Sequence, residues 1–368
     1  MDMTRRAAAV ALASGLVGMV RGQESETISK RRPVSESESS DQTVIRVDVN
    51  LVNLFCTVRR HNGKLVSNLT QDDFRVLEDG QEQNVTAFSR ETDLPVKLGM
   101  LVDISGSQRN LIGTERDAAS AFFSNVMRRQ DEAFLLAFGH DTDLVQDFTG
   151  SVPKLQAALD TLQGDVRAGS TGQRGGGQRS GGGGGWGGGG IGMGGRGRHG
   201  GSGQRRQQPS GGNGKGTLLF DAAYLASHDE LAPKPGRKAL ILITDGEDRG
   251  SYYSRTQATE QAQKADAVIY SIYYVDPNAY RGLGNEEPKN GFSDLQRMSR
   301  ETGGQVFKVN KELTLGKVFD EIQAQMRSQY SLAYKSNLPP VPGQFRKVEI
   351  LTRSDEFEVQ ARNGYYAK

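Results

Sequence analysis

Hydrophobic and polar positions change their pattern twice along the chain. From Thr43 to about residue 90, apolar side chains alternate with polar ones, which is typical of strands with one buried face. Between residues 94 and 335, runs of consecutive apolar residues alternate with segments that have apolar residues at helical spacing, and after Tyr330 the alternating pattern returns. Unbroken apolar strands separated by amphipathic helices predict a doubly wound α/β unit, in which helices cover both faces of a parallel sheet.

The pattern also sets the expected elements. In the α/β unit we expect strands at 96–103, 133–138, 239–244, 268–275 and 306–309, and helices at 109–129, 155–162, 256–266, 295–301 and 315–327. Asn62-Gly63 and Asp79-Gly80 predict tight turns between strands of the N-terminal segment.

The N-terminal β segment is too short to bury both of its faces alone. We therefore expect residues 43–92 and 336–368 to pair into one small β-sandwich, with the α/β unit, 93–335, inserted between them. The alternative is that each β segment packs separately against the α/β unit.

A glycine-rich insertion interrupts the α/β unit at residues 169–216. It contains 25 of the 47 glycines and a single Trp, so it offers too little apolar surface to offset its chain entropy and should be disordered. Loop closure costs grow only logarithmically with length, so an insertion of this size is tolerated.

The glycine-rich insertion also holds seven Lys and Arg and no acidic residue. Since the whole chain carries +2, the remainder sits near −5, which does not suggest a nucleic-acid-binding body.

The N-terminus has the pattern of an export signal. Arg5-Arg6 precedes an apolar stretch, and small residues at Val20 and Gly22 would allow cleavage after Gly22, which makes residues 1–22 a signal peptide. The stretch is short for a transmembrane span, although an uncleaved anchor is the alternative, and the export route is left open between the general and the twin-arginine pathway. Residues 23–42 are rich in Ser and Glu and read as a disordered linker.

Cys56 is the only cysteine, so the chain can form no internal disulfide. Its apolar neighbours Phe55 and Val58 indicate a buried structural thiol rather than a nucleophile.

One motif contains side chains that could bind a metal ion. The apolar run 96–103 ends in Asp-Ile-Ser-Gly-Ser, which delivers the carboxylate of Asp103 and the hydroxyls of Ser105 and Ser107 to the end of a buried strand. Hard oxygen ligands of this kind suit Mg²⁺ or Mn²⁺. The serines add no charge, so a bound ion would stay electrophilic. The alternative is that these side chains only cap the following helix.

The chain resembles the von Willebrand factor A domain. The resemblance rests on Asp-x-Ser-x-Ser, on Gly216-Thr217 before a later helix, and on Thr244-Asp245-Gly246 at the end of another strand. Further motifs are similar to the VWFA-related proteins common in Acidobacteria: Leu-Thr-Gln-Asp-Asp-Phe at 69–74, Glu-Asp-Gly at 78–80 and Arg-Asn-Gly-Tyr-Tyr at 362–366. The resemblance covers roughly residues 43–367 and implies a Rossmann-like domain with a metal-ion-dependent adhesion site.

The resemblance also implies roles for individual residues. Ser105 and Ser107 would coordinate Mg²⁺ or Mn²⁺ directly, and Thr217 would supply a third hydroxyl. Asp103 would hold a metal-bound water and orient Ser105, and Asp245 would complete the site through water. The glycine-rich insertion ends just before Thr217, so it could gate or block this site.

Together these features predict an exported, non-enzymatic binding or adhesion protein of the periplasm, cell surface or medium. Its partner would be a protein that offers an Asp or Glu carboxylate to the metal. A structural envelope scaffold with an unused site is the first alternative. A Mg²⁺-dependent hydrolase is less favoured, because the four histidines are scattered and no hydrolase motif occurs. We expect no specific nucleic-acid partner and no transmembrane span in the mature chain; the basic insertion would at most contact anionic surface polymers weakly.

Overall fold

The computed structural model describes residues 51–91, 94–163, 216–280, 290–339 and 341–367. The predicted signal peptide and linker, the start of the first β segment and nearly all of the glycine-rich insertion lie outside these ranges.

The centre of the fold is a six-stranded sheet. Its order is β11 (Val306–Lys308), β10 (Ala267–Tyr273), β9 (Arg237–Thr244), β6 (Val96–Asp103), β7 (Glu132–Phe138) and β8 (Thr142–Thr149). Neighbouring strands from β11 to β7 pair in parallel, as the unbroken apolar runs predict. The edge strand β8 is a correction, because it pairs with β7 in the antiparallel direction and has no counterpart in the expected elements. Its residues are only partly buried, so no apolar run marks it.

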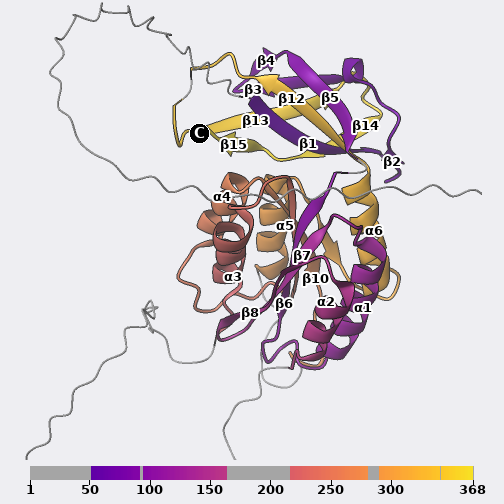
Figure 1. Cartoon of the computed structure of the whole chain (residues 1–368), viewed down its shortest axis with the longest axis vertical. Helices are drawn as coiled ribbons and strands as arrows, with labels where there is room; N and C mark the ends of the chain where they lie inside the picture. The colour runs from indigo at the N-terminus through magenta and orange to yellow at the C-terminus, as the bar shows by residue number, and fades with distance from the viewer. Residues whose placement is uncertain (1–50, 92–93, 164–215, 281–289, 340, 368) are drawn as a thin grey trace, which may run out of the picture. The chain divides into compact units, whose positions relative to one another are not determined.

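Helices cover both faces of this sheet (Figure 1). Figure 1 shows α1 (Ile112–Val126), α2 (Val152–Asp160) and α6 (Leu315–Arg327) on one side of it, and α3 (Leu219–Leu225), α4 (Arg255–Lys264) and α5 (Gly291–Thr302) on the other. A π-helical segment, Ala226–Leu231, continues α3. The neighbouring β6 residues Met100 and Leu101 are both fully buried, one in each of the two cores that flank the sheet. The doubly wound α/β class is therefore confirmed.

The remaining strands form one β unit from both ends of the described chain. In its first sheet β1 pairs with β2, β12 and β14, and β12 also pairs with β5; the second sheet has the order β15-β13-β3-β4. The two sheets share one core, to which Leu54, Val76, Tyr330 and Ile350 contribute. The strand bounds are β1 Leu51–Arg60, β2 Leu65–Val66, β3 Phe74–Glu78, β4 Gln81–Gln83, β5 Val85–Glu91, β12 Gln329–Lys335, β13 Phe345–Thr352, β14 Phe357–Ala361 and β15 Gly364–Tyr366, with a short 3-10 turn at Gln71–Asp73.

Strand β12 lies inside the range 93–335 that the sequence pattern assigned to the α/β unit, yet its pairing places it in the β unit. The change between units therefore falls between α6 and β12. Other local expectations agree with the structure: Asp79 and Gly80 both have positive φ, as a two-residue hairpin turn requires. Cys56 lies buried in the core of the β unit, where burial raises the pKa of its thiol.

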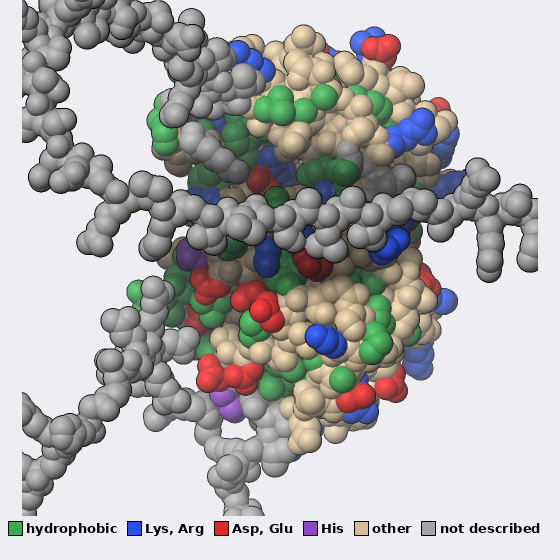
Figure 2. Space-filling view, in the orientation of Figure 1, with side chains coloured by type: hydrophobic (Ala, Val, Ile, Leu, Met, Phe, Trp, Pro, Cys, Tyr) green, Lys and Arg blue, Asp and Glu red, His purple; other side chains and the backbone are tan. Residues whose placement is uncertain are grey.

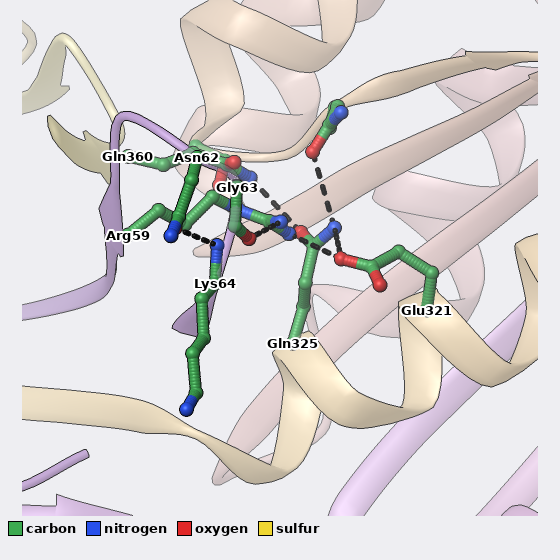
Figure 3. Close-up of polar contacts among 9 residues, drawn as sticks. Arg59, Asn62, Gly63, Lys64, Glu321, Gln325 and Gln360 are labelled. Atoms are coloured by element: carbon green, nitrogen blue, oxygen red, sulfur yellow. Dashed lines mark hydrogen bonds and ion pairs between the residues drawn. The ribbon is translucent and has the colours of Figure 1, made fainter. Parts of the chain in front are cut away.

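Polar side chains connect β1 and β14 with helix α6 (Figure 3). Arg59 donates to Glu321 Oε1 over 2.7 Å and to the carbonyl of Gly63 over 3.1 Å, and Gln360 Nε2 donates to Gln325 Oε1 over 3.3 Å. The turn after β1 is held by the Lys64 amide, which donates to Asn62 Oδ1 over 3.1 Å. These contacts tie the two β segments to the last helix of the α/β unit.

The surface fits the mildly acidic balance of the folded part. On the face shown in Figure 2, acidic side chains gather over α3, while Lys and Arg side chains are scattered. Among the helices that the structure describes, none is long and apolar enough to cross a membrane.

Candidate metal centre

The ends of two adjacent parallel strands form the base of the centre. In the sheet Val102 of β6 lies opposite Ile243 of β9, so Asp103 and Thr244 both come at the carboxyl edge. The Thr244 hydroxyl donates to Asp103 Oδ2 over 2.6 Å and itself accepts a hydrogen bond from the Gly246 amide over 3.0 Å. Asp103 and Thr244 are completely buried, so this pair fixes the carboxylate rigidly below the loops.

The motif loop folds back over Asp103. The Ser105 amide donates to Asp103 Oδ1 over 2.9 Å, which is the turn expected of a short acidic side chain two residues earlier. This turn brings Ser105 Oγ to within 3.1 Å of Ser107 Oγ. Ser105 is buried, whereas Ser107 is partly exposed and Gly106 is exposed, so the loop opens to solvent at Gly106 and Ser107.

Asp245 lies directly after β9 and is also fully buried. Its Oδ1 accepts a hydrogen bond from the Glu247 amide over 3.0 Å, and its Oδ2 accepts one from the Tyr280 hydroxyl over 2.6 Å. Tyr280 also interacts with Ser107 through its hydroxyl, so it links the two sides of the centre. Burial and the negative charge of Asp245 raise the pKa of Tyr280, which keeps the phenol neutral and a donor.

Thr217 is positioned through its backbone. Its carbonyl accepts a hydrogen bond from the Arg249 amide over 2.9 Å, and the next residue, Leu218, donates to the Gly139 carbonyl at the end of β7 over 3.0 Å. Thr217 is buried, 4 % exposed. The three predicted loops therefore meet at one edge of the sheet, where open α/β sheets bind ligands. Asp103, Ser105, Ser107 and Asp245 are linked by side-chain interactions, whereas Thr217 joins them through the backbone of the β9 loop.

Two acidic residues that follow Asp245 have structural partners. Asp248 Oδ1 accepts hydrogen bonds from the Phe220 amide over 3.1 Å and from the Ser251 hydroxyl over 2.5 Å, and so holds the start of α3. Glu247 forms an ion pair with Arg249 over 2.5 Å.

The two buried carboxylates, Asp103 and Asp245, are electrostatically unfavourable in the absence of a cation. Burial and the nearby charge of Asp245 raise the pKa of Asp103 to about 7, and hydrogen bonds from Ser105 and Thr244 oppose that rise. No Lys or Arg is among the groups that act on Asp103 within the described part of the chain. Two neighbouring buried carboxylates without a positive partner are strongly unfavourable.

The donor set fits a hard divalent cation. Three hydroxyls and two carboxylates are oxygen donors, and Mg²⁺ keeps several waters, so a mixed shell suits it. Across the described ranges there is no group of three or more His, Cys, Asp and Glu side chains arranged to hold a metal.

A matched pair of glycine substitutions tests the placement of Thr217. A Cβ on Gly216 would lie 1.8 Å from the Arg249 carbonyl oxygen, whereas one on Gly106 would meet nothing within 4 Å. Gly216→Ala must therefore push the Thr217 loop away from the β9 loop, and we expect it to weaken Mn²⁺ binding about tenfold, within the range seen when supports of metal ligands are lost. Gly106→Ala should leave the affinity near that of wild type. Equal affinities in a calorimetric titration of the two variants would contradict this placement.

Sequence reasoning gave no role to three residues that act on the two aspartates. Thr244 and Tyr280 bind the two aspartates, and Glu115 on α1 interacts electrostatically with both. Glu115 could have been noticed, since it is a charged residue at helical spacing from the apolar Ile112 and Ala119. Tyr280 has no such signal, because only the folded chain brings it to Asp245.

Comparisons with known proteins give structural likeness alone. No protein-family model matches the chain, and no curated protein matches it. Among solved structures, BatB from Bacteroides thetaiotaomicron is 15% identical with a TM-score of 0.41, covering 63% of this chain and 97% of its own. An aerotolerance-related membrane protein from Bacteroides fragilis is 13% identical with a TM-score of 0.40, covering 63% and 98%. A von Willebrand factor type A structure from Catenulispora acidiphila is 12% identical with a TM-score of 0.42, covering 82% and 74%.

Proposed function

We propose that this chain is a binding module that uses Mg²⁺ or Mn²⁺ at the Asp103 centre to capture a carboxylate of a protein partner. The observation that supports the proposal most is the juxtaposition of two buried carboxylates, without a basic partner acting on Asp103, and two adjacent serine hydroxyls. A divalent cation would compensate the buried charge. An open coordination position on the ion would accept an oxygen of an Asp or Glu side chain.

The hydroxyl and carboxylate residues of the centre would have different roles. Neutral hydroxyls would hold the cation, from Ser105, Ser107 and Thr217. These ligands would leave the charge of the cation unchanged. The Asp103 carboxylate accepts a hydrogen bond from the Ser105 amide, which orients the loop at Ser105, and it would also hold a water. The Asp245 carboxylate accepts one from the Glu247 amide and would hold a water in the same way. The exposure of Gly106 and the partial exposure of Ser107 give a partner a path to the centre.

Binding is favoured over catalysis by the placement of the described histidines. Their ring nitrogens contact Asp355, Gly216 and Asp229, so within the described chain none of them pairs with a serine of the motif as a general base would. We further propose that the chain acts outside the cytoplasm, on the pattern of its first 22 residues.

Selection from a random peptide library displayed on phage tests the capture step. The full chain is immobilised in 5 to 10 mM Mg²⁺ (about the level that saturates a millimolar site), and bound phage are eluted with EDTA. We expect the eluted peptides to share an Asp or Glu that cannot be replaced by Asn or Gln, and we expect the Asp245→Asn chain to retain none of them.

Two results would count against capture. Peptides that bind equally well in EDTA would place their binding site elsewhere on the surface. Tight metal binding by the chain, together with no carboxylate-dependent peptide, would favour a structural scaffold with a resident ion.

A further inference from the structure

A cleft opens where β1 and β15 approach the end of α4 and the starts of β9 and β10. It consists of two neighbouring hollows with volumes of about 230 and 540 Å³. Four residues line both hollows: Asn53, Gln263, Asp266 and Arg362. The larger hollow alone falls within the range of about 300–1,000 Å³ that is typical of sites for small molecules.

The cleft lies at the amino edge of the six-stranded sheet. Arg237 and Lys238 begin β9 and line the larger hollow. Ala267 and Val268 begin β10 and line it as well. The metal centre lies at the opposite end of β9, beyond Thr244, and a strand rises about 3.3 Å per residue, so about 20 Å separate the two. The cleft is therefore distinct from the metal centre.

The walls of the cleft are strongly cationic, although the chain outside the glycine-rich insertion carries a net charge near −5. Among the described residues that line the two hollows, Asp266 is the only acidic one. The basic residues that line them are Lys234, Arg237, Lys238, Lys264, Arg346 and Arg362. Like charges in a cleft focus the electric field and attract ions of the opposite sign.

Neutral oxygen atoms hold two of these cations in place. Arg237 donates to the Met326 carbonyl and to Gln329 Oε1, both over 2.5 Å. Lys238 Nζ donates to the Ala265 carbonyl over 2.8 Å. Such acceptors fix the two side chains without cancelling their positive charge.

Arg362 is fixed between the two hollows. Its guanidinium forms an ion pair with Asp266 and donates to the Asn53 carbonyl over 2.7 Å, and it lies 5.7 Å from the ring centre of Tyr365. Its Nε is buried and has no hydrogen-bond partner within the described chain, so these contacts leave one of its donors unused. The rest of the cleft wall includes apolar and aromatic side chains: Val52, Phe55, Leu94, Leu338, Tyr365 and Tyr366.

We propose that this cleft binds a small organic anion with two or more carboxylate or phosphate groups on a partly apolar body. The cations would hold the charged groups, since guanidinium and ammonium groups bind both carboxylate and phosphate. The apolar and aromatic wall would contact the carbon skeleton of the ligand. The inference is independent of the proposed function, because the cleft and the metal centre share no residue.

Titration calorimetry of citrate and of inorganic pyrophosphate into the full chain tests the proposal. The buffer is freed of divalent cations on a chelating resin, because both probes bind these ions and EDTA is itself a polyanion. We expect the wild type to bind at least one probe. Tighter binding of citrate would identify a ligand with carboxylates, and tighter binding of pyrophosphate one with phosphates. No binding of either probe at about 10 mM, which would saturate a millimolar site, overturns the proposal.

A double variant locates the binding site. Lys234→Gln with Lys238→Gln removes two positive charges from the larger hollow, where both side chains are partly exposed. We expect it to bind the probe about tenfold more weakly than wild type, as the loss of two partly exposed ion pairs implies. The matched control is Lys154→Gln with Lys311→Gln, since these two lysines are exposed and do not line the cleft. The control should keep the affinity of wild type.

An equal loss of affinity in the two double variants would show that general surface charge attracts the anion, and would overturn the site. If the cleft variant melts at a lower temperature than wild type, Lys264→Gln is compared with Lys154→Gln in its place. Lys264 is exposed and lines the smaller hollow. A weaker affinity in Lys264→Gln alone supports the cleft, and equal affinities contradict it.

Discussion

Replacing Asp103 with Asn should weaken Mn²⁺ binding by about 10–100-fold, the range measured for residues that orient the ligands of a metal. Asp103 accepts hydrogen bonds from the Ser105 amide and the Thr244 hydroxyl, so it fixes the loop that presents both serines. Asn has the same shape and can keep the loop in place. The loss would therefore come mainly from the missing negative charge, which no basic side chain acting on Asp103 replaces within the described residues.

Glu247→Gln is the matched control for this substitution. Glu247 lies two residues after Asp245 and forms an ion pair with Arg249, so its replacement removes an equal charge close to the centre without touching a proposed ligand. Calorimetric titration of Mn²⁺ at pH 8 into wild type and both variants compares the affinities. A loss in Glu247→Gln as large as that in Asp103→Asn would point to general surface charge and against a built site.

In the absence of divalent cations, the chain should lose stability as pH rises from 4 to 8. Burial and the charge of Asp245 raise the pKa of Asp103 from 3.8 to about 7 in the folded chain. Between these two values the folded chain keeps a proton that the unfolded chain has released. The free energy of unfolding must therefore fall as pH rises through this window, and it levels off above about pH 7.

The size of this effect is large for a single residue. A pKa of about 7 in place of 3.8 lowers the free energy of unfolding above pH 7 by on the order of 4 kcal/mol.

Urea unfolding at pH 5 and pH 8 in EDTA measures the loss. The Asp103→Asn chain should show a smaller difference between the two pH values, and Mg²⁺ should restore wild-type stability more at pH 8 than at pH 5. A wild-type chain that is equally stable at both pH values, or whose pH dependence Asp103→Asn leaves unchanged, would contradict this electrostatic account.

The sequence pattern identified the α/β unit because its strands are buried on both faces. An unbroken run such as Ala239–Ile243 is difficult to place anywhere except a covered parallel sheet, and the structure places it at the centre of one. Strand β8 was not predicted, because an edge strand needs no run of apolar residues. The alternating pattern already returns at Tyr330, so the boundary set at residue 335 was a few residues too late, and the pairing of β12 with β1 places the strand in the β unit.

The candidate site was predicted only as far as its motifs extend. Asp103, Ser105 and Ser107 are neighbours in sequence, so their meeting follows from one turn. Tyr280 lies in the segment after β10, and only tertiary packing brings its hydroxyl to Asp245. Glu115 lies on α1 and acts on both aspartates electrostatically. Spacing alone cannot reveal such neighbours, although a charged residue on an apolar helical face is a usable signal.

The most direct test of the metal centre is an anomalous diffraction measurement on crystals of the chain grown with Mn²⁺. The account predicts one strong peak at coordination distance, about 2.0–2.2 Å, from the hydroxyl oxygens of Ser105 and Ser107. A peak elsewhere on the protein, or none at this edge of the sheet in saturating Mn²⁺, would contradict it.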